Sequence, residues 1–389
     1  MKLKAVATFN NESVNKTAYL DFINYLDTSN ITRGTISAVV RMNIKDAPSR
    51  AKRLVRKNDI VYSTVRPNLE HYGIIEYPKD NMVVSTGFAV IRVNPELADP
   101  HFVYLAITQP NITKHLHSIA ETTTSAYPSI RPEVLEELEI DLPPMAKQKG
   151  IARFIKRIDD KIASNTHTND NLHNIVEAMF RETYNTGSPE TLGSLLHSVE
   201  SGSRPKGGAA TSGIPSIGAE KIENFGYYDF SSEKFIDHGY YQKLKRGKLK
   251  DGDVLLYKDG AYTGKSSLAL DGFPHSEAAV NEHVFILNTK NNFAQFFLYF
   301  CVHIDENRDK LHTLAAGKAA QPGLNQSELG SINILLPGEE KIKAFEKSVS
   351  PLMHQIAQNA KENRRLATLR DTLLPELMNG KIDLSKVEI

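Results

Sequence analysis

The chain has 389 residues, of which 40% are hydrophobic and 24% are charged, and its net charge is +1. These values describe a soluble globular protein of two or more domains and argue against a nonspecific polyanion binder. The lone Cys301 excludes a disulfide framework and fits a reducing cytoplasm. No apolar stretch long enough for a signal peptide opens the sequence, and the longest apolar run, Phe293–Val302, is about half of a membrane span. We therefore expect a cytoplasmic protein without a membrane partner, in which this run forms a buried helix.

The chain is predicted to open with a mixed domain over residues 1–142. Short runs of strand-forming residues at 59–63 and 89–93 are followed by a predicted helix from Pro100 to His117. A long central helix is predicted within 143–186, because no Gly or Pro interrupts the chain between Gly150 and about Tyr184. The Gly-Ser-Pro sequence that follows it is a strong boundary.

The same order of elements then recurs. A second mixed domain is predicted over 187–337, and a second helix region over 338–389. The second helix is predicted to begin at Glu339 and to end at about Leu374, close to Pro375 and Gly380. The predicted fold class is therefore α+β, with two mixed α/β domains joined by two long antiparallel helices in a pseudo-two-fold internal duplication.

The evidence for duplication is a match between the two halves at a constant shift of 194 residues. This shift superimposes four stretches of the first half on the second: Asp59-Ile60-Val61 on Asp253-Val254-Leu255, Val90–Asn94 on Val284–Asn288, Ile140–Pro143 on Ile334–Pro337, and Asn165 and Asn169 on Asn359 and Asn363. A repeat of this length is a duplicated domain with its connector, because solenoid units recur every 20–50 residues or so. Two-fold molecules are suited to binding other two-fold molecules, and duplex DNA is the commonest of these.

Both long helices carry apolar residues at alternating steps of four and three, which is the pattern of a coiled-coil seam. The first seam contains Ile151, Ile155, Ile158, Ile162, Asn165, Asn169 and Leu172. The second contains Phe345, Val349, Leu352, Ile356, Asn359, Asn363 and Leu366. Because neither seam can stay in water, we expect the two helices to pair with each other in an antiparallel arrangement.

Two asparagines lie midway along each seam, and antiparallel pairing predicts that they meet. Asn165 and Asn169 would then face Asn359 and Asn363. Buried Asn in a coiled coil fixes the register at some cost in stability. The alternative is that these side chains face solvent where the seam is locally loose.

Local clusters of positive charge precede the strands that the two halves share. The first cluster includes Arg41, Lys45, Arg50, Lys52 and Arg53, and the second includes Lys243, Lys245 and Arg246. One such cluster alone is usually a solvated surface. Because the cluster recurs at corresponding positions in both halves, contact with phosphates and simple solvation are equally supported interpretations.

Candidate DNA-binding residues also lie in the polar, turn-rich segments that follow the shared strands. Arg, Lys, Asn and Gln match base edges, whereas Ser, Thr and Tyr more often hold phosphates. In the first domain the candidates are Arg66, Asn68, His71, Thr124 and Tyr127. In the second they are Lys258, Tyr262, Lys265, Lys318 and Gln321, with Ser203, Arg204 and Lys206 in a Gly-rich loop. For each of them the alternative is an ordinary solvated side chain.

The sequence lacks the motifs of the common nucleotide and metal sites. Gly260 and Gly264 are separated by three residues, whereas a phosphate-binding loop needs four before its helix begins. His115 and His117 would point to different faces of a helix, and no Cys or carboxylate partner is evident. We expect no catalytic residue, metal or cofactor in this chain.

Six stretches of sequence resemble one protein family. The segment LPPMAKQKGIARFIKRIDDKIASNTHTNDNLHNIVEAMFRETY is similar to the central conserved region of the specificity subunits of type I restriction–modification systems. The ending RRLATLRDTLLPELMNGKIDL resembles the distal conserved region of that family. VRKNDIVYSTVRPN with STGFAVIRV, and KDGDVLLYKDGAYTGK with AVNEHVFIL, resemble the framework strands of its two target recognition domains.

This resemblance implies a non-catalytic subunit that binds DNA. Each recognition domain would read one half of a bipartite, asymmetric site in double-stranded DNA, and the paired helices would set the spacer between the halves. The helices would also dock two methyltransferase subunits, which two restriction–translocase subunits then join. S-adenosylmethionine, ATP and Mg²⁺ are expected on those partner subunits.

Two alternatives belong to other classes of protein. The chain could be a two-headed adaptor that binds protein partners through its repeats and uses the coiled coil as a spacer. It could also be an enzyme whose active site is not visible in a linear sequence, although the two halves share no plausible acid–base or nucleophilic set. Enrichment of a two-part motif from random DNA duplexes would distinguish DNA binding from the adaptor.

Overall fold

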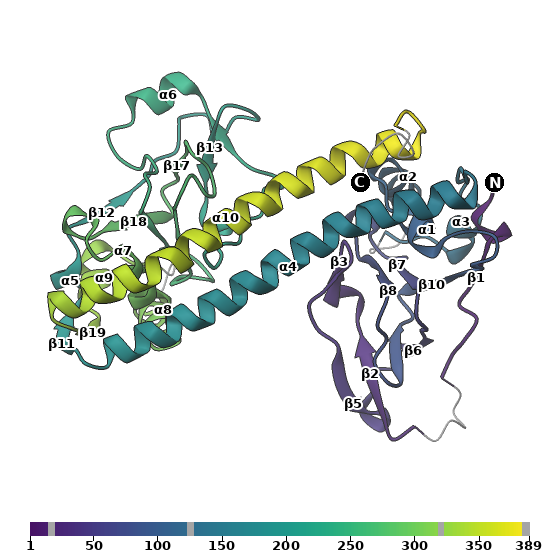
Figure 1. Ribbon diagram of the computed structural model, residues 1–389, viewed down its shortest axis with the longest axis horizontal. Coiled ribbons are helices and arrows are strands. Elements are labelled where there is room, and N and C mark those ends of the chain that lie inside the picture. Colours follow the sequence, from purple (N-terminus) through teal and green to yellow (C-terminus); the bar gives the residue numbers. More distant parts are fainter. Residues whose placement is uncertain (15–19, 123–127, 318–322, 383–389) are drawn as a thin grey trace. The chain divides into compact units, whose positions relative to one another are not determined.

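The computed structural model describes residues 1–14, 20–122, 128–317 and 323–382, and it divides into two compact units. Unit 1 comprises Met1–Ile158 and Leu369–Ile389, and unit 2 comprises Asp159–Thr368. Both units are mixed α/β, and each takes one part of each long helix (Figure 1). Within the described ranges, no helix has both the length and the apolar composition that crossing a membrane requires.

Unit 1 contains two four-stranded sheets. The first has the order β1-β10-β7-β8 and is antiparallel throughout. The second has the order β5-β2-β9-β6, in which only the central pair β2–β9 is parallel. A short hairpin, β3–β4, lies beside them. The strands are β1 (Ala7–Phe9), β2 (Phe22–Leu26), β3 (Ile31–Thr32), β4 (Thr35–Ile36), β5 (Val40–Asn43), β6 (Ala51–Leu54), β7 (Asp59–Ser63), β8 (Tyr72–Ile75), β9 (Met82–Ser85) and β10 (Phe88–Val93).

Unit 2 repeats this plan. Its main sheet has the order β12-β18-β15-β16 and is antiparallel, and its second sheet, β14-β13-β17, again has one parallel pair. An additional two-stranded sheet joins β11 to β19. The strands are β11 (Ser188–Thr191), β12 (Ser198–Ser201), β13 (Ile214–Ile217), β14 (Phe235–Ile236), β15 (Val254–Tyr257), β16 (Ser266–Leu268), β17 (Ala279–Val280), β18 (Val284–Asn288) and β19 (Asn333–Leu336).

Short helices pack around the sheets of each unit, and α6 of unit 2 lies against the second sheet. Unit 1 has α1 (Pro100–Ile107), α2 (Pro110–Glu121) and α3 (Pro132–Glu136). Unit 2 has α5 (Leu192–Leu195), α6 (His238–Lys243), α7 (Gln295–His303), α8 (Asp305–Ala316) and α9 (Gln326–Gly330). Every residue of α7 is buried, which confirms the prediction that the longest apolar run is a core helix.

The helix predicted from Pro100 to His117 is wrong in one respect, because the structure divides it into α1 and α2. Gln109 has an extended backbone, with φ −63° and ψ 146°, and Pro110 begins the second helix. A proline has no N–H to continue the first helix, and its ring disfavours the helical conformation of the preceding residue. The two helices therefore meet at a break that the proline imposes.

The internal repeat is confirmed, with one correction to its alignment. The shift of 194 holds for β7 and β15, but the strand pairing places Phe88 opposite Ser63 in unit 1 and Val284 opposite Tyr257 in unit 2. Val284 therefore corresponds to Phe88 and not to Val90. Because side chains alternate with a period of two along a strand, a two-residue insertion leaves the buried face of the strand unchanged. The sequence match at 194 was consequently good even where the structural match is shifted.

The two long helices are α4 (Met145–Tyr184) and α10 (Glu339–Met378) (teal and yellow in Figure 1). The predicted end of α10 near Leu374 is wrong, because the helix continues through Pro375 to Met378. In unit 1, Leu377 is buried with Ile151 and Ile155 of α4. Burial of that side chain offsets the one backbone hydrogen bond that a proline in the last turn removes.

Antiparallel pairing of α4 with α10 is seen within each unit. In unit 1 the last turns of α10 pack on the first turns of α4, and in unit 2 Phe180 contacts Phe345 at a ring-centroid distance of 6.0 Å. Buried members of the predicted seams are Ile151, Ile155, Ile158, Phe345, Val349 and Ile356. The remaining apolar members are partly buried, and these are Ile162, Leu172, Leu352 and Leu366.

A polar side chain of each long helix also accepts a hydrogen bond from the N-terminal end of a short helix. In unit 1, the buried Gln148 accepts the N–H of Asp99, the residue that caps α1. In unit 2, Glu346 accepts the N–H of Phe297 in the first turn of α7 at 2.7 Å. Burial raises the pKa of Glu346 to about 7. These contacts place a polar acceptor at a helix N-terminus, where backbone donors lack partners.

The four seam asparagines meet within unit 2, as the antiparallel pairing predicts. Asn359 Nδ2 donates to Asn169 Oδ1 at 2.9 Å, and Asn169 Nδ2 donates to the Ile356 carbonyl at 3.2 Å. Asn165 Nδ2 donates to Asn363 Oδ1 at 2.9 Å. Asn169 is only 2% exposed, so the solvent-facing alternative is wrong for this residue. An amide pair of this kind is satisfied in one register only.

Replacing one amide of the buried pair should destabilise the protein, because it leaves the other without a partner. We expect Asn169→Ala to lower the free energy of unfolding by roughly 1–3 kcal/mol in urea denaturation. The double variant Asn169→Leu with Asn359→Leu should recover most of that loss, since no polar group is then left unpaired. The exposed Asn171→Ala is the control and should change stability by less than about 0.5 kcal/mol. A double variant as unstable as the single one would contradict this account.

Candidate nucleic-acid interface

The basic segment of unit 1 lies on the outer strands of its second sheet. Arg41 on β5, Lys45 and Arg50 in the connection and Lys52 on β6 are exposed. The Arg41 guanidinium lies over the Phe22 ring, 3.9 Å from its centroid. These four cations can reach an anionic partner, since Lys and Arg are the usual phosphate contacts.

Arg53 differs from its neighbours, because it is partly buried and bonded within the fold. Its Nη1 donates to Asn10 Oδ1 at 2.6 Å, and burial lowers the pKa of its guanidinium. This contact joins β6 to Asn10, the residue that follows β1. The structure therefore gives Arg53 a role in holding the two sheets of unit 1 together.

In unit 2 the corresponding basic segment begins at the last residue of α6. Lys243, Lys245 and Arg246 are exposed, and the neighbouring Lys248 lies over the Tyr241 ring at 4.8 Å. Lys248 forms an antiparallel bridge with Ala279 of β17, as β6 pairs with β9 in unit 1. The structure thus places the two basic segments beside equivalent strands of the second sheets.

The same hydrogen bond, from a backbone N–H to an aspartate, occurs where each basic segment leads into a strand of the main sheet. The N–H of Arg56 donates to Asp59 Oδ2 at 2.8 Å in unit 1, and the N–H of Lys250 donates to Asp253 Oδ2 at 2.7 Å in unit 2. The surroundings of the two buried aspartates differ. Asp59 accepts two hydrogen bonds from Arg92, at 2.7 and 2.8 Å. Burial raises the pKa of Asp253 to about 6.

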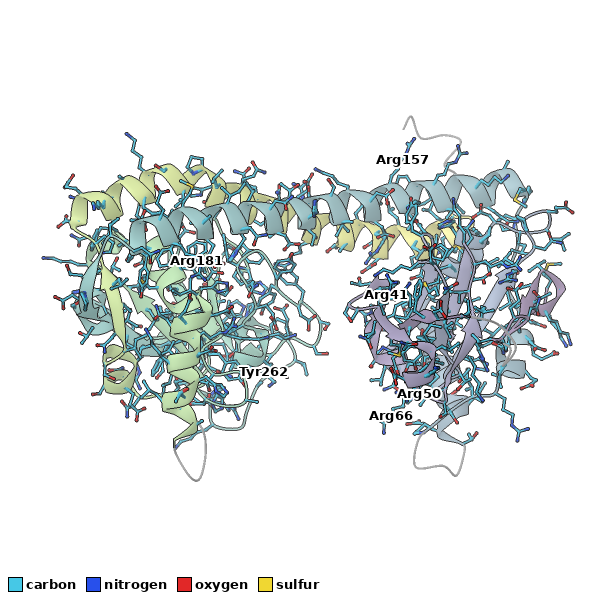
Figure 2. All side chains as sticks on the ribbon, turned by 90° about the horizontal axis from the view of Figure 1, so that it is seen from below. Arg41, Arg50, Arg66, Arg157, Arg181 and Tyr262 are labelled. Carbon is cyan, nitrogen blue, oxygen red and sulfur yellow. The ribbon has the colours of Figure 1, made fainter. Side chains whose placement is uncertain are left out.

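The candidate loop of unit 1, residues 64–71, connects β7 to β8. Arg66 and Asn68 are exposed, whereas the ring of His71 is bonded to the Ile31 carbonyl at 2.7 Å. Figure 2 shows Arg50 and Arg66 at the end of unit 1 that lies away from α4. The structure therefore brings these two exposed arginines to one end of the unit, although they are distant in sequence.

The equivalent loop of unit 2, residues 258–265, connects β15 to β16. Tyr262 is 63% exposed, and Lys265 lies over its ring at 4.9 Å. Lys265 also forms an ion pair with Glu223 at 2.7 Å, and Lys258 pairs with Asp259 at 3.3 Å. Figure 2 shows Tyr262 on the side of unit 2 that lies away from α4.

The Gly-rich loop of unit 2 holds three further candidates. Ser203 Oγ is 2.8 Å from Tyr240 Oη, Arg204 pairs with Glu282 at 2.9 Å, and Lys206 is exposed. Four other candidates lie outside the described residues, namely Thr124, Tyr127, Lys318 and Gln321.

Sequence reasoning missed the acidic partners of several candidate cations. Lys265 and Glu223 are 42 residues apart, and Arg50 and Asp27, which pair at 2.6 Å, are 23 apart. Such pairs are not visible in a linear sequence, because neither lies at a helical or strand spacing. Each pair is partly solvated, so its strength is modest and a phosphate can compete for the cation.

Two exposed apolar residues were also missed, although the sequence carried a signal for them. Ile175 on α4 is 51% exposed, and Leu369 on α10 is 45% exposed. They are separated by the repeat shift of 194 residues. An exposed apolar side chain is unremarkable alone, but recurrence at one position in both repeats indicates a surface that each repeat uses.

Comparison with known proteins gives one consistent result. Residues 1–174 match the family model described as "Type I restriction modification DNA specificity domain". The specificity subunit of the HindI type I restriction enzyme from Haemophilus influenzae is 26% identical, over 87% of this chain and 90% of the relative. The MjaIX specificity subunit from Methanocaldococcus jannaschii is 22% identical, over 81% of this chain and 76% of the relative.

A solved structure has a similar fold. The crystal structure of the type I restriction–modification S subunit from M. genitalium aligns with a TM-score of 0.59 and 14% sequence identity. The alignment covers 97% of this chain and 95% of that chain. At this level of identity the likeness concerns the fold alone.

The two buried aspartates should respond in opposite ways to replacement by Asn. Because the pKa of Asp253 is raised from 3.8 to about 6, its ionised form is disfavoured in the folded state, and stability is lost as pH rises through this range. Asp253→Asn should therefore raise the free energy of unfolding by about 1–3 kcal/mol at pH 7.5, and the gain should disappear near pH 4. Urea denaturation at the two pH values measures this difference.

Asp59→Asn is the matched comparison at the equivalent position. It removes one charge from the pair with Arg92 and should lower stability by about 1.5–3 kcal/mol at pH 7.5. If both variants changed stability in the same direction at that pH, the difference between the two sites would be refuted.

Proposed function

We propose that this chain is a specificity subunit of the type I restriction–modification family and that it reads a bipartite and asymmetric DNA sequence. Each unit would bind one half of the site in double-stranded DNA. Specificity subunits are the non-catalytic members of these systems, so recognition and assembly are the activities that this chain contributes.

This proposal is supported chiefly by the fact that the two units share one backbone scaffold but have different surface side chains. The main sheets of both units have the same strand order, and their β7–β8 and β15–β16 loops have the same length. The loop residues differ, with Arg66 and Asn68 in unit 1 where unit 2 has Gly260 and Tyr262. A repeated scaffold with different polar side chains supports two different half-sites, since identical units would read a palindrome.

The charge distribution supports DNA as the ligand. The net charge is only +1, yet exposed cations gather beside the same strands in both units. In our proposal Arg41, Lys45, Arg50 and Lys52 contact phosphates, and so do Lys243, Lys245 and Arg246. Such contacts position a protein on the duplex, whereas base contacts from the loops would give the sequence preference.

The long helices are proposed to set the spacer between the half-sites. Both α4 and α10 have 40 residues, which corresponds to about 60 Å of helix. The hydrogen bonds between their buried amides form in one antiparallel register only. A fixed register gives the helix pair a fixed length, which a constant spacer requires.

The outer faces of the same helices are proposed to dock the partner subunits. Two methyltransferase subunits would each bind one repeat, at a surface that contains Ile175 or Leu369. Two restriction–translocase subunits would then join this assembly. S-adenosylmethionine, ATP and Mg²⁺ are proposed to act on these partner subunits and not on this chain.

Selection from a library of random DNA duplexes tests the proposed function. The full chain, with its methyltransferase subunits, should enrich a two-part motif whose halves differ and whose gap is constant. A protein-binding adaptor would enrich no such motif. Absence of any enriched motif would therefore reject DNA reading as the function of this chain.

A deletion variant extends the same experiment to the spacer. Removing residues 165–171 together with 359–365 takes one heptad from each helix, or roughly 10 Å of length. The enriched gap should then shorten by about three base pairs, at ~3.4 Å for each pair. If the gap is unchanged, the helices do not set the spacer.

The docking surface can be tested one repeat at a time. Ile175→Asp and Leu369→Asp each place a charge in the proposed apolar contact and should reduce the complex from two methyltransferase subunits to one, as measured by native mass spectrometry. The double variant should bind none. The control variants Ile175→Leu and Leu369→Ile keep the apolar surface and should bind two. Full binding by the double variant would contradict this placement.

A further inference from the structure

The β7–β8 loop of unit 1 and the β15–β16 loop of unit 2 have the same length and share several backbone hydrogen bonds. The N–H of Thr64 donates to Gly87 O, and the N–H of Lys258 donates to His283 O. The carbonyl oxygen of each of these two residues also accepts a hydrogen bond, from the N–H of Ile130 in unit 1 and from the N–H of Leu324 in unit 2. The Thr64–Ile130 and Lys258–Leu324 bonds are related by the repeat shift of 194 at both ends.

The turn within each loop is the same too. The N–H of Leu69 donates to Arg66 O in unit 1, and the N–H of Thr263 donates to Gly260 O in unit 2. Together these bonds hold each loop in one conformation. A binding element held in this way loses little conformational entropy when it contacts a ligand.

Both loops have positive φ angles at the same two positions. In unit 2 both positions are glycines, Gly260 at φ +127° and Gly264 at φ +100°. In unit 1 they are Arg66 at φ +48° and Glu70 at φ +55°. Residues with a Cβ atom are strained in this region, and the residue before a proline is restricted further, as Arg66 is by Pro67. Unit 1 therefore keeps two side chains where its own duplicate uses glycine.

The two strained side chains have different roles in the loop. Glu70 forms an ion pair with Arg33, whose N–H also donates to Glu70 O, so this carboxylate fastens the base of the loop. Arg66 is exposed at the end of unit 1 that lies away from α4 (Figure 2). Arginine has five N–H donors in a planar fork, so a contact within the protein leaves others for a ligand. A strained and exposed residue on a rigid loop is typical of a binding site.

We propose that Arg66 reads a guanine in the half-site of unit 1, and that its strained backbone is kept because the guanidinium makes this contact. Arg donating to O6 and N7 of guanine is the commonest specific contact in the major groove. Gly260, the equivalent residue of unit 2, has no side chain to read a base. The inference rests on the proposed DNA-reading function and assigns one base contact within it.

Two substitutions of Arg66 separate the effect of backbone strain on stability from the effect of the guanidinium on base recognition. Arg66→Ala and Arg66→Gly both remove the guanidinium, but only Gly relieves the backbone. The Gly variant should therefore melt about 1–3 °C higher than the Ala variant. Both should lose discrimination at one guanine of one half-site by about tenfold or more in competition binding, while preference at the other half-site is unchanged.

Asn58→Gly is the control for strain relief outside the loop. Asn58 has φ +66°, and its equivalent in unit 2 is Gly252 at φ +86°. This variant should melt at or above the wild-type temperature and keep every base preference. Gly260→Ala places a Cβ atom in the same strained position of unit 2 and should lower the melting temperature without creating a guanine preference there.

Three outcomes would overturn the inference while leaving the proposed function intact. Both Arg66 variants could keep the wild-type preference at every base pair of the two-part motif. Affinity could fall equally for all sequences with a smaller salt dependence, which would make Arg66 a phosphate contact only. The Gly variant could melt below the Ala variant, which would remove the argument from strain. Absence of a two-part motif for the wild-type chain would instead reject the proposed function itself.

Discussion

The structure depends on the need to bury the apolar seams of two 40-residue helices. Each seam is long and apolar, and within each unit the helices bury it against each other in an antiparallel pair. Apolar contact alone tolerates sliding by a heptad, whereas the Asn169–Asn359 amide pair is satisfied in one register only. The register of the helices is therefore set by a polar contact, and their stability by the apolar ones around it.

Duplication followed by divergence explains how one scaffold carries two different sets of surface side chains. The buried parts of the two units are constrained by strand order and by alternation of side chains. They are also constrained by the aspartate that accepts a backbone hydrogen bond from the end of each basic segment. Even there the surroundings differ, since Asp59 pairs with Arg92 whereas burial raises the pKa of Asp253 to about 6. The loops are less constrained by packing, and their exposed side chains have diverged completely at the positions of Arg66 and Asn68.

The same loops differ in backbone strain between the two units. A glycine is the least strained residue at both positive-φ positions, and unit 2 uses it at both. Unit 1 has Arg66 and Glu70 there, so its loop is less stable than its backbone allows. Such local conflicts between sequence and backbone are expected at functional sites. The conflict at Arg66 is therefore more informative than its exposure or its charge.

Sequence alone determined the repeat, the two long helices and the meeting of their asparagines. The period of apolar residues along a helix and the constant shift between the two halves can both be read directly from the chain. It failed at Pro110 and Pro375, where the same residue type breaks one helix and is tolerated in another. Only the tertiary structure decided between these outcomes, since Leu377 is buried beyond the second proline. It also decided which cations are paired, as for Lys265 with Glu223, because those partners are brought together by folding and not by spacing along the chain.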